Sequence, residues 1–112
     1  MAAFRWEPAT GNITLITLNP MPRYYCTARS TNFDGSIITG DEFFGGGAWI
    51  WTQADGAAAL ASWLPAHGVN LSALGVNPET IADPYISQDG TTLLIAASCG
   101  NGCTRRLNIR FN

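Results

Sequence analysis

Residues 45–64 constrain the fold of this chain most strongly. They begin with three glycines at 45–47, continue with the apolar run Ala-Trp-Ile-Trp at 48–51, and then become rich in alanine. An apolar run of this length, bounded by glycines, is typical of a strand, and alternate residues of a strand share one face of a sheet. We therefore expect Trp49 and Trp51 on the same face.

An α-helix is expected directly after this strand. Thr52 and Asp55 have the three-residue spacing of a short capping box, in which a hydroxyl and a carboxylate accept the free amide protons of the first turn. Pro65 cannot continue a helix, and Gly68 is typical of a position just beyond a helical end. The pattern therefore predicts one principal α-helix over about residues 53–64.

This helix would have few polar residues on the side away from a sheet. Its strongly polar positions are Gln53, Asp55 and Ser62. The whole chain is also weakly charged, because charged residues make up 12% of the sequence, against about 25% in ordinary soluble domains. Either water tolerates the exposed alanines, as is common for single apolar residues, or the second face of the helix contacts another chain.

The charge of the chain argues against several classes of partner. The formal net charge is −2 and the sequence pI is about 5.0, so no basic surface for nucleic acid or an anionic membrane is evident. Residues 1–10 include Arg5 and Glu7 and lack the apolar run of a signal peptide. The longest apolar run elsewhere, residues 93–97, is too short to span a bilayer. We expect a soluble protein made in the cytoplasm, with no nucleic-acid or membrane partner.

Most of the remaining sequence indicates short antiparallel strands. Phe4 and Trp6 alternate with Arg5 and Glu7, as expected for a half-buried strand with its aromatic residues on one face. Together with the rest of the pattern, this predicts a single α+β domain over residues 1–112, formed mainly by an antiparallel sheet with one principal helix and short helical turns. Further strands are expected at residues 12–18, 23–28, 36–39, 85–88, 91–98 and 104–111.

Two hairpins give the strongest local signals. Asp89 and Gly90 suit the positive backbone angles of a type I′ turn. Cys99 and Cys103 flank a Gly-Asn-Gly loop that would place them opposite one another across a second hairpin. In the last strand, alternation directs the apolar residues inward; these residues are Leu107, Ile109 and Phe111.

Cys99 and Cys103 could form a disulfide, provide half of a metal site, or remain free thiols, as expected in a reducing cytosol. A zinc site needs about four ligands, and with Cys26 and His67 the chain has only four candidates, which are scattered through the sequence. We therefore expect no metal. No cofactor is expected either, because the glycines at 45–47 precede a strand and carry no Lys, Ser or Thr that could help to hold a phosphate.

Hydrolytic chemistry would depend on His67, the only histidine of the chain. No Gly-x-Ser-x-Gly elbow is present, and no serine has a recognisable catalytic motif around it. The simpler interpretation places His67 near the negative end of the preceding helix, where a polar or cationic residue is favourable. A small hydrolase is therefore the third hypothesis, and it predicts a cleft that contains His67.

Aromatic residues are the remaining candidates for binding a ligand or a partner. Trp49 and Trp51 could form a flat stacking surface for a sugar or another protein, although paired tryptophans beside a helix more often belong to the core. The candidate residues are Tyr24, Tyr25, Phe43, Phe44, Trp49 and Trp51.

The sequence contains no catalytic motif and predicts a non-enzymatic structural or interaction module. Its weakly charged surface would be partly covered by copies of itself or by another structural protein. An accessory or decoration protein of a virion is the most concrete form of this hypothesis, which follows from small size and low charge rather than from a motif. The second hypothesis is a carbohydrate-binding module that uses exposed aromatic rings. Other small-molecule ligands are not expected.

Overall fold

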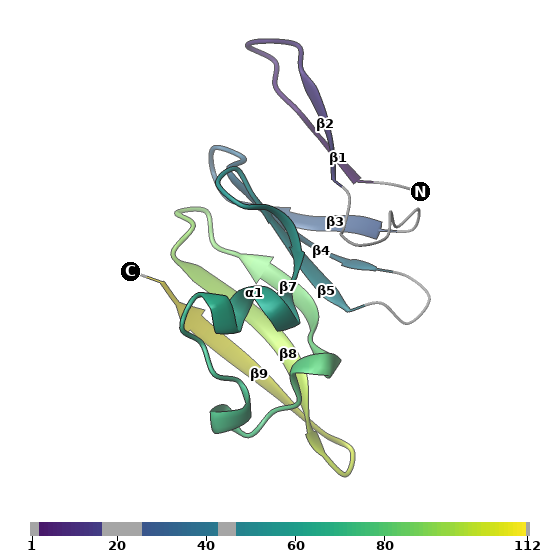
Figure 1. Cartoon of the computed structure of the whole chain (residues 1–112), viewed down its shortest axis with the longest axis vertical. Coiled ribbons are helices and arrows are strands. Elements are labelled where there is room, and N and C mark those ends of the chain that lie inside the picture. Colours follow the sequence, from purple (N-terminus) through teal and green to yellow (C-terminus); the bar gives the residue numbers. More distant parts are fainter. Residues whose placement is uncertain (1–2, 17–25, 43–46, 112) are drawn as a thin grey trace.

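The computed structural model describes residues 3–16, 26–42 and 47–111, which form three antiparallel sheets and one short α-helix (Figure 1). Strands β1 and β2 form a two-stranded arm, the central sheet has the order β3-β4-β5-β6, and the C-terminal sheet has the order β7-β8-β9. The predicted fold class, an antiparallel α+β domain with one helix and short helical turns, is confirmed. The elements are β1 Ala3–Trp6, β2 Ile13–Ile16, β3 Cys26–Thr31, β4 Ile37–Glu42, β5 Ala48–Thr52, β6 Gly56–Ala59, α1 Leu60–Ala66, the 3-10 turns η1 Ser72–Leu74 and η2 Pro78–Thr80, β7 Ala82–Ile86, β8 Thr92–Gly100 and β9 Cys103–Arg110.

The main core lies between the central sheet, α1 and the C-terminal sheet. Leu60 and Leu64 of α1 are fully buried in one cluster with Ile50 of β5 and with Leu93 and Ile95 of β8. The helix thus uses a narrow apolar stripe, spaced four residues apart, to join the two sheets.

Polar contacts also join the central and C-terminal sheets. Thr39 of β4 is fully buried, and its Oγ1 donates to the Pro84 carbonyl of β7 at 3.1 Å. The Ser30 hydroxyl of β3 lies 2.7 Å from Thr39 Oγ1 and accepts the Ile86 amide proton at 2.9 Å. Each such bond contributes about 1 kcal/mol, and leaving a buried partner unpaired would cost more. The relative position of the two sheets is therefore fixed by side chains as well as by the apolar core.

Strand β5 is buried on both faces. Its Ala48 and Ile50 belong to the main core, whereas Trp49 and Trp51 point to the other face, as the alternation predicted, and form a second buried cluster with Ala3 and Ile38. The arm therefore contributes to this second core through its first described residue.

The principal helix begins later than predicted, because the expected range was residues 53–64 and α1 overlaps it only at residues 60–64. Residues 56–59 instead form β6, which pairs with β5, and α1 begins only at Leu60. Thr52 Oγ1 does accept the Asp55 amide proton, at 3.0 Å, but it does so in the turn between β5 and β6. Pro65 lies inside the last turn of α1, and Gly68, with a φ of 84°, follows its end as expected. The alanines of this segment have small side chains that also fit a strand beside the tryptophans of β5, so tertiary pairing overrides their helix propensity.

The hairpin around Asp89 is confirmed, but its turn is not the predicted two-residue type I′ turn. Strands β7 and β8 are joined by residues 87–91, and within this loop only Gly90 has a positive φ, of 75°. The Gly90 amide donates to the Ser87 carbonyl at 3.0 Å, and the Asp89 carboxylate accepts from the hydroxyls of Ser87 and Thr91. These hydrogen bonds, that of Ser87 first, lower the pKa of Asp89 to about 2 and favour a longer turn closed by the side chain.

Two other strand predictions have clear outcomes. Strand β4 continues to Glu42, beyond the predicted end at residue 39, because Asp41 pairs with Ala48 of β5 and its carboxylate forms an ion pair with Arg29. In the last strand, Ile109 is buried and Leu107 is half-buried, as predicted, while Arg106 and Arg110 are exposed.

Candidate functional site

The β1–β2 arm projects from the outer side of the central sheet (Figure 1). Its strands pair from Ala3 with Ile16 to Trp6 with Ile13. The connection is closed by hydrogen bonds from the Glu7 amide to the Asn12 carbonyl at 2.9 Å and from the Gly11 amide to the Glu7 carbonyl at 2.7 Å. A two-stranded hairpin is marginally stable by itself in water, so the arm depends on its contacts with other surfaces.

The aromatic face of β1 points to solvent, whereas the sequence pattern predicted that it would be buried. Phe4 and Trp6 are each 58% exposed, and Ile13, which pairs with Trp6, is 65% exposed. The alternation of Phe4 and Trp6 with Arg5 is present, but the aromatic residues do not face a core. An apolar strand face that stays in water is unusual, because local pattern and global burial normally agree.

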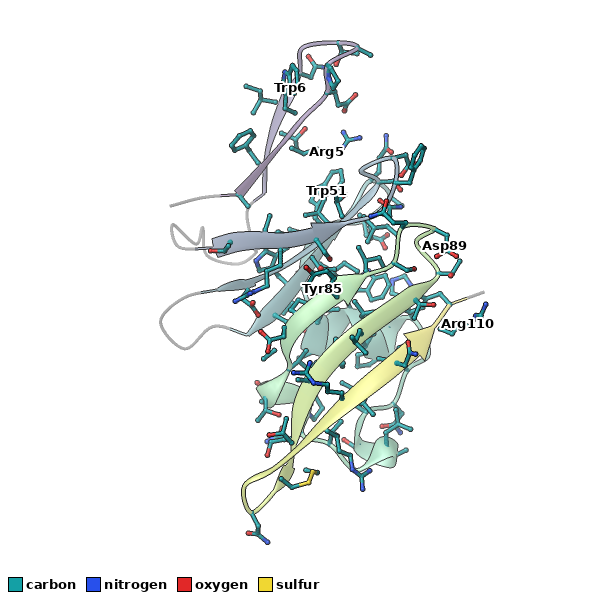
Figure 2. All side chains as sticks on the ribbon, turned by 180° about the vertical axis from the view of Figure 1, so that it is seen from behind. Arg5, Trp6, Trp51, Tyr85, Asp89 and Arg110 are labelled. Carbon is teal, nitrogen blue, oxygen red and sulfur yellow. A yellow bond between two sulfur atoms is a disulfide. The ribbon has the colours of Figure 1, made fainter. Side chains whose placement is uncertain are left out.

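Arg5 explains this orientation. Its Nε donates to the Gly35 carbonyl at 2.7 Å, its guanidinium lies 5.4 Å from the centre of the Trp51 ring, and it forms an ion pair with Glu7. Figure 2 shows Arg5 and Trp51 between the arm and the central sheet. A planar guanidinium satisfies a carbonyl, a carboxylate and an aromatic face together, so the side of β1 that carries Arg5 is the one held against the body.

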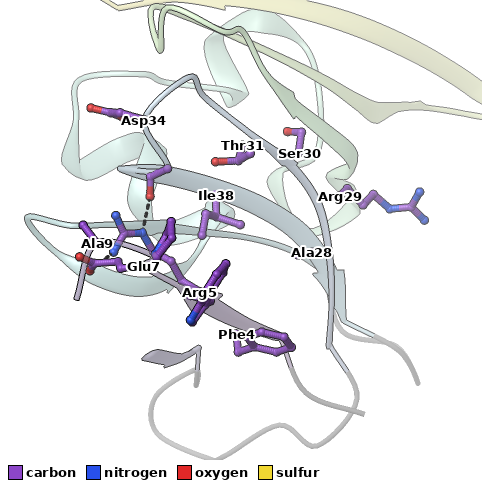
Figure 3. Close-up of a pocket in the computed structure, with 13 residues that line it drawn as sticks. Phe4, Arg5, Glu7, Ala9, Ala28, Arg29, Ser30, Thr31, Asp34 and Ile38 are labelled. Carbon is purple, nitrogen blue, oxygen red and sulfur yellow. Dashed lines mark hydrogen bonds and ion pairs between the residues drawn. The ribbon is translucent and has the colours of Figure 1, made fainter. Parts of the chain in front are cut away.

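A groove lies between the arm and strands β3 and β4 (Figure 3). It has a volume of about 580 Å³, which is within the range of roughly 300–1,000 Å³ typical of binding pockets. Phe4 and Trp6 line it from the arm, and Ala28 and Ile38 line it from the central sheet. The apolar face of the arm and the groove therefore form one continuous surface, which we call the arm surface.

Charged residues of both signs also line the groove. Arg5 and Glu7 come from the arm, whereas Arg29 and Asp34 come from β3 and the following turn. The pKa of Asp34 is lowered by hydrogen bonds from the Ser36 hydroxyl and amide, so its carboxylate is ionised at neutral pH. The lining therefore has two positive and two negative groups and no net charge.

The structure places the predicted aromatic residues differently from an exposed stacking surface. Trp49 is fully buried and Trp51 is 9% exposed, and Trp49 Nε1 donates to the Asp41 carbonyl at 3.1 Å. Neither ring is available to a ligand. The other four candidates lie outside the described residues; they are Tyr24, Tyr25, Phe43 and Phe44.

Phe4 and Trp6, the exposed aromatic residues of the arm, were not candidates in the sequence. The signal that could have found them is their alternation with charged residues, which shows that they share a face but not that this face lies in solvent.

Cys99 and Cys103 are joined by a disulfide, with their Cα atoms 5.1 Å apart. The loop between them has a positive φ at Gly100, Asn101 and Gly102, which permits the tight reversal. In the described part of the chain, no group of three or more His, Cys, Asp or Glu residues is placed to hold a metal ion.

His67 lies at the C-terminal end of α1, near the negative helix end as predicted. Its ring stacks on Trp63 with 3.9 Å between centroids, and its Nε2 is 3.4 Å from a carboxylate oxygen of Asp55. A cavity of about 440 Å³ does contain His67, but none of the described residues that line it is Ser, Thr or Cys. Among its described lining residues, this cavity therefore has the imidazole of His67 but no side-chain nucleophile beside it.

Comparison with known proteins finds no matching family model, no matching curated protein and no matching solved structure. Among the described residues, none of the helices has the length and apolar character required to cross a membrane. Any functional conclusion therefore depends on the geometry described above.

Proposed function

We propose that this protein is a non-enzymatic structural or interaction module that self-associates or docks on a larger symmetric assembly, and that the arm surface is its docking site. The observation that carries this proposal is the exposure of Phe4, Trp6 and Ile13 on one face of the arm. An accessory or decoration protein of a virion is a concrete form of such a module.

The size of the exposed apolar face supports this proposal. An aromatic side chain has about 150–250 Å² of surface, so the 58% exposure of Phe4 and Trp6 leaves roughly 230 Å² of ring surface in water, and Ile13 adds about 100 Å². The total is within the range of the largest apolar patches on monomeric proteins, which are often functional. An exposed Trp is also the residue type that most often dominates binding energy in protein interfaces.

The two alternative hypotheses are less well supported, although the cavity that contains His67 is the feature that the hydrolase hypothesis predicts. A carbohydrate-binding module would need exposed rings on which sugars can stack, but Trp49 and Trp51 are both buried. A hydrolase that uses His67 lacks a neighbouring nucleophile among the described residues of its cavity.

The mass of the full chain in solution tests the proposal. Light scattering should be measured over a wide concentration range, with the chain alone and with a purified candidate partner. We expect a mass above 12.0 kDa or a stable complex with that partner. A monodisperse, highly soluble monomer under all of these conditions would contradict the proposed function.

A further inference from the structure

We infer that the groove of the arm surface binds an extended segment of a partner protein, which pairs its backbone with the outer edge of β3, the edge away from β4. This segment carries a basic residue and places apolar side chains against Phe4 and Trp6. The inference rests on the proposed function, because it names the chemistry of the partner at the same docking surface.

The lining of the groove shows that an edge of β3 faces it. Four consecutive residues of this strand, 28–31, contribute to the lining, and Figure 3 labels them along one wall of the groove. Successive side chains of a strand point to opposite faces of a sheet, so a groove that contacts four residues in a row passes the edge of the strand. Strand β4 occupies one edge of β3, and the groove therefore follows the outer edge.

This outer edge has unpaired backbone groups. Among the described residues, the backbone of β3 pairs with β4 alone, so the N–H and C=O groups of the outer edge have no partner there. Natural proteins commonly protect such an edge with lysine, proline or inward-pointing charges. Strand β3 contains no Lys or Pro, and its single charged residue, Arg29, forms an ion pair with Asp41 of β4. The edge is therefore suited to strand addition, in which an extended peptide joins a sheet.

The arm supplies contacts for the side chains of such a segment. Phe4 and Trp6 share one face of β1, are each 58% exposed and line the same groove as the edge of β3. In strand addition, main-chain hydrogen bonds supply affinity and the contacts of alternate side chains supply specificity. We therefore expect apolar residues at alternate positions of the partner segment.

Asp34 requires a positive charge on the partner. The two arginines of the lining already have carboxylate partners, whereas no cation among the described residues contributes to the lowered pKa of Asp34. Its Oδ1 accepts the amide and the hydroxyl of Ser36, and these bonds keep the carboxylate ionised at neutral pH. Figure 3 shows Asp34 and Phe4 at opposite ends of the groove. The partner segment should therefore carry Lys or Arg toward one of its ends.

The volume of the groove limits the length of the segment. A residue of a packed strand occupies about 160 Å³, because strands rise about 3.3 Å per residue, lie about 4.8 Å apart and pack in sheets about 10 Å apart. The groove of about 580 Å³ therefore holds about four residues. The register shift between Ala28 and Ser30 also bends the edge, which favours a short pairing.

A contact of this length is weak by itself. Interfaces that bury less than about 1,200 Å² are typical of transient encounters. The proposed larger assembly would present its docking segment repeatedly, and multivalency then strengthens attachment without any additional contact.

A phage-displayed library of random nonapeptides tests the inference, because multivalent display retains weak binders. The full chain is the bait, Trp6→Ser is the variant for counter-selection, and Leu94→Ser is the matched control, since Leu94 is an exposed apolar residue of the C-terminal sheet. We expect selected sequences with alternating apolar residues and a Lys or Arg.

A synthetic peptide of the consensus sequence then measures each contact. It should bind Trp6→Ser at least about tenfold more weakly, because an exposed Trp often dominates an interface. It should bind Asp34→Asn about threefold more weakly, because an exposed ion pair contributes little. Binding to Leu94→Ser should stay within about twofold of the wild type.

Methylation of the peptide amides tests the strand pairing itself. Successive N–H groups of a strand point to opposite edges. N-methylation of one alternate set should therefore weaken binding at least about tenfold, and N-methylation of the other set should weaken it less than about threefold.

Four outcomes would overturn the inference or part of it. If no peptide is enriched on the wild type over Trp6→Ser and over a second variant, Phe4→Ser, the inference fails, while light scattering still tests the proposed function independently. Equal effects of the two methylated sets would exclude pairing with the edge of β3. Unchanged binding to Asp34→Asn would exclude the basic residue. Peptides that bind Trp6→Ser but not Leu94→Ser would assign binding to the C-terminal sheet. Circular dichroism verifies that each variant is folded.

Discussion

Substitution of Gly40 by alanine tests whether the tryptophans of β5 are locked in a second core. An added Cβ at Gly40 would lie 2.5 Å from Cζ2 of Trp49 and closer still to the Thr27 carbonyl oxygen. Backbone of β3 would therefore have to move, or the indole ring would have to leave its position. Gly47 provides the matched control, because a Cβ there would meet only the Ile81 carbonyl oxygen, at 4.0 Å.

The magnitude follows from the two contacts that the added methyl group disturbs. Overpacking a well-packed core typically costs about 1–3 kcal/mol, and loss of the hydrogen bond from Trp49 Nε1 to the Asp41 carbonyl would add about 1 kcal/mol. We expect Gly40→Ala to lower the free energy of unfolding by about 3 kcal/mol, and Gly47→Ala to change it by less than about 0.5 kcal/mol. A domain of this size would lose on the order of 10 °C in Tm.

Urea unfolding followed by tryptophan fluorescence measures this difference directly. The reasoning fails if Gly40→Ala and Gly47→Ala have the same unfolding midpoint. Such a result would mean that Trp49 can move away from Gly40 at little cost, and the rings of β5 would again be candidates for ligand binding.

Two further predictions concern the hairpins of the C-terminal sheet. The pKa of Asp89 is lowered from 3.8 to about 2. The ionised carboxylate therefore stabilises the fold fully above pH 3.8, and this stabilisation is lost as the pH falls through about 2. Urea midpoints measured across this window should show a smaller acid-induced loss of stability in Asp89→Asn than in the wild type. Reduction of the disulfide between Cys99 and Cys103 should lower the free energy of unfolding by at most about 2 kcal/mol, because the closed loop is short and β8 and β9 already pair beside it. Unfolding with and without dithiothreitol checks this value, and loss of the far-ultraviolet circular dichroism signal on reduction would contradict it.

The sequence predicted the last strand well, because charged residues there mark the solvent side. In β9, Arg106 and Arg110 alternate with Leu107 and Ile109, and the burial agrees with the pattern. The alanine-rich segment after Thr52 has no such marker, because alanine is small enough for either a helix or a strand beside large side chains. Its assignment to β6 depends on pairing with β5, which local sequence cannot show.

The candidate site was missed for a different physical reason. The sequence of β1 shows that Phe4 and Trp6 share a face, and this part of the prediction agrees with the strand pairing. Whether that face is covered depends on which side of the hairpin meets the body, and Arg5 decides this through the carbonyl of Gly35 and the ring of Trp51. Both partners are distant in the sequence, so periodicity alone favoured the buried orientation.

The residues that orient the arm are different from the residues that form its exposed apolar face. The guanidinium of Arg5 sets the direction in which the hairpin leaves the body, whereas in the proposed docking Phe4, Trp6 and Ile13 would supply the contact with a neighbour. Replacement of Arg5 would remove the contacts that orient the hairpin, whereas Phe4, Trp6 and Ile13 would keep their identity. In an assembly of the proposed kind, the residues that fix the angle between adjoining units would therefore differ from the residues that hold the units together.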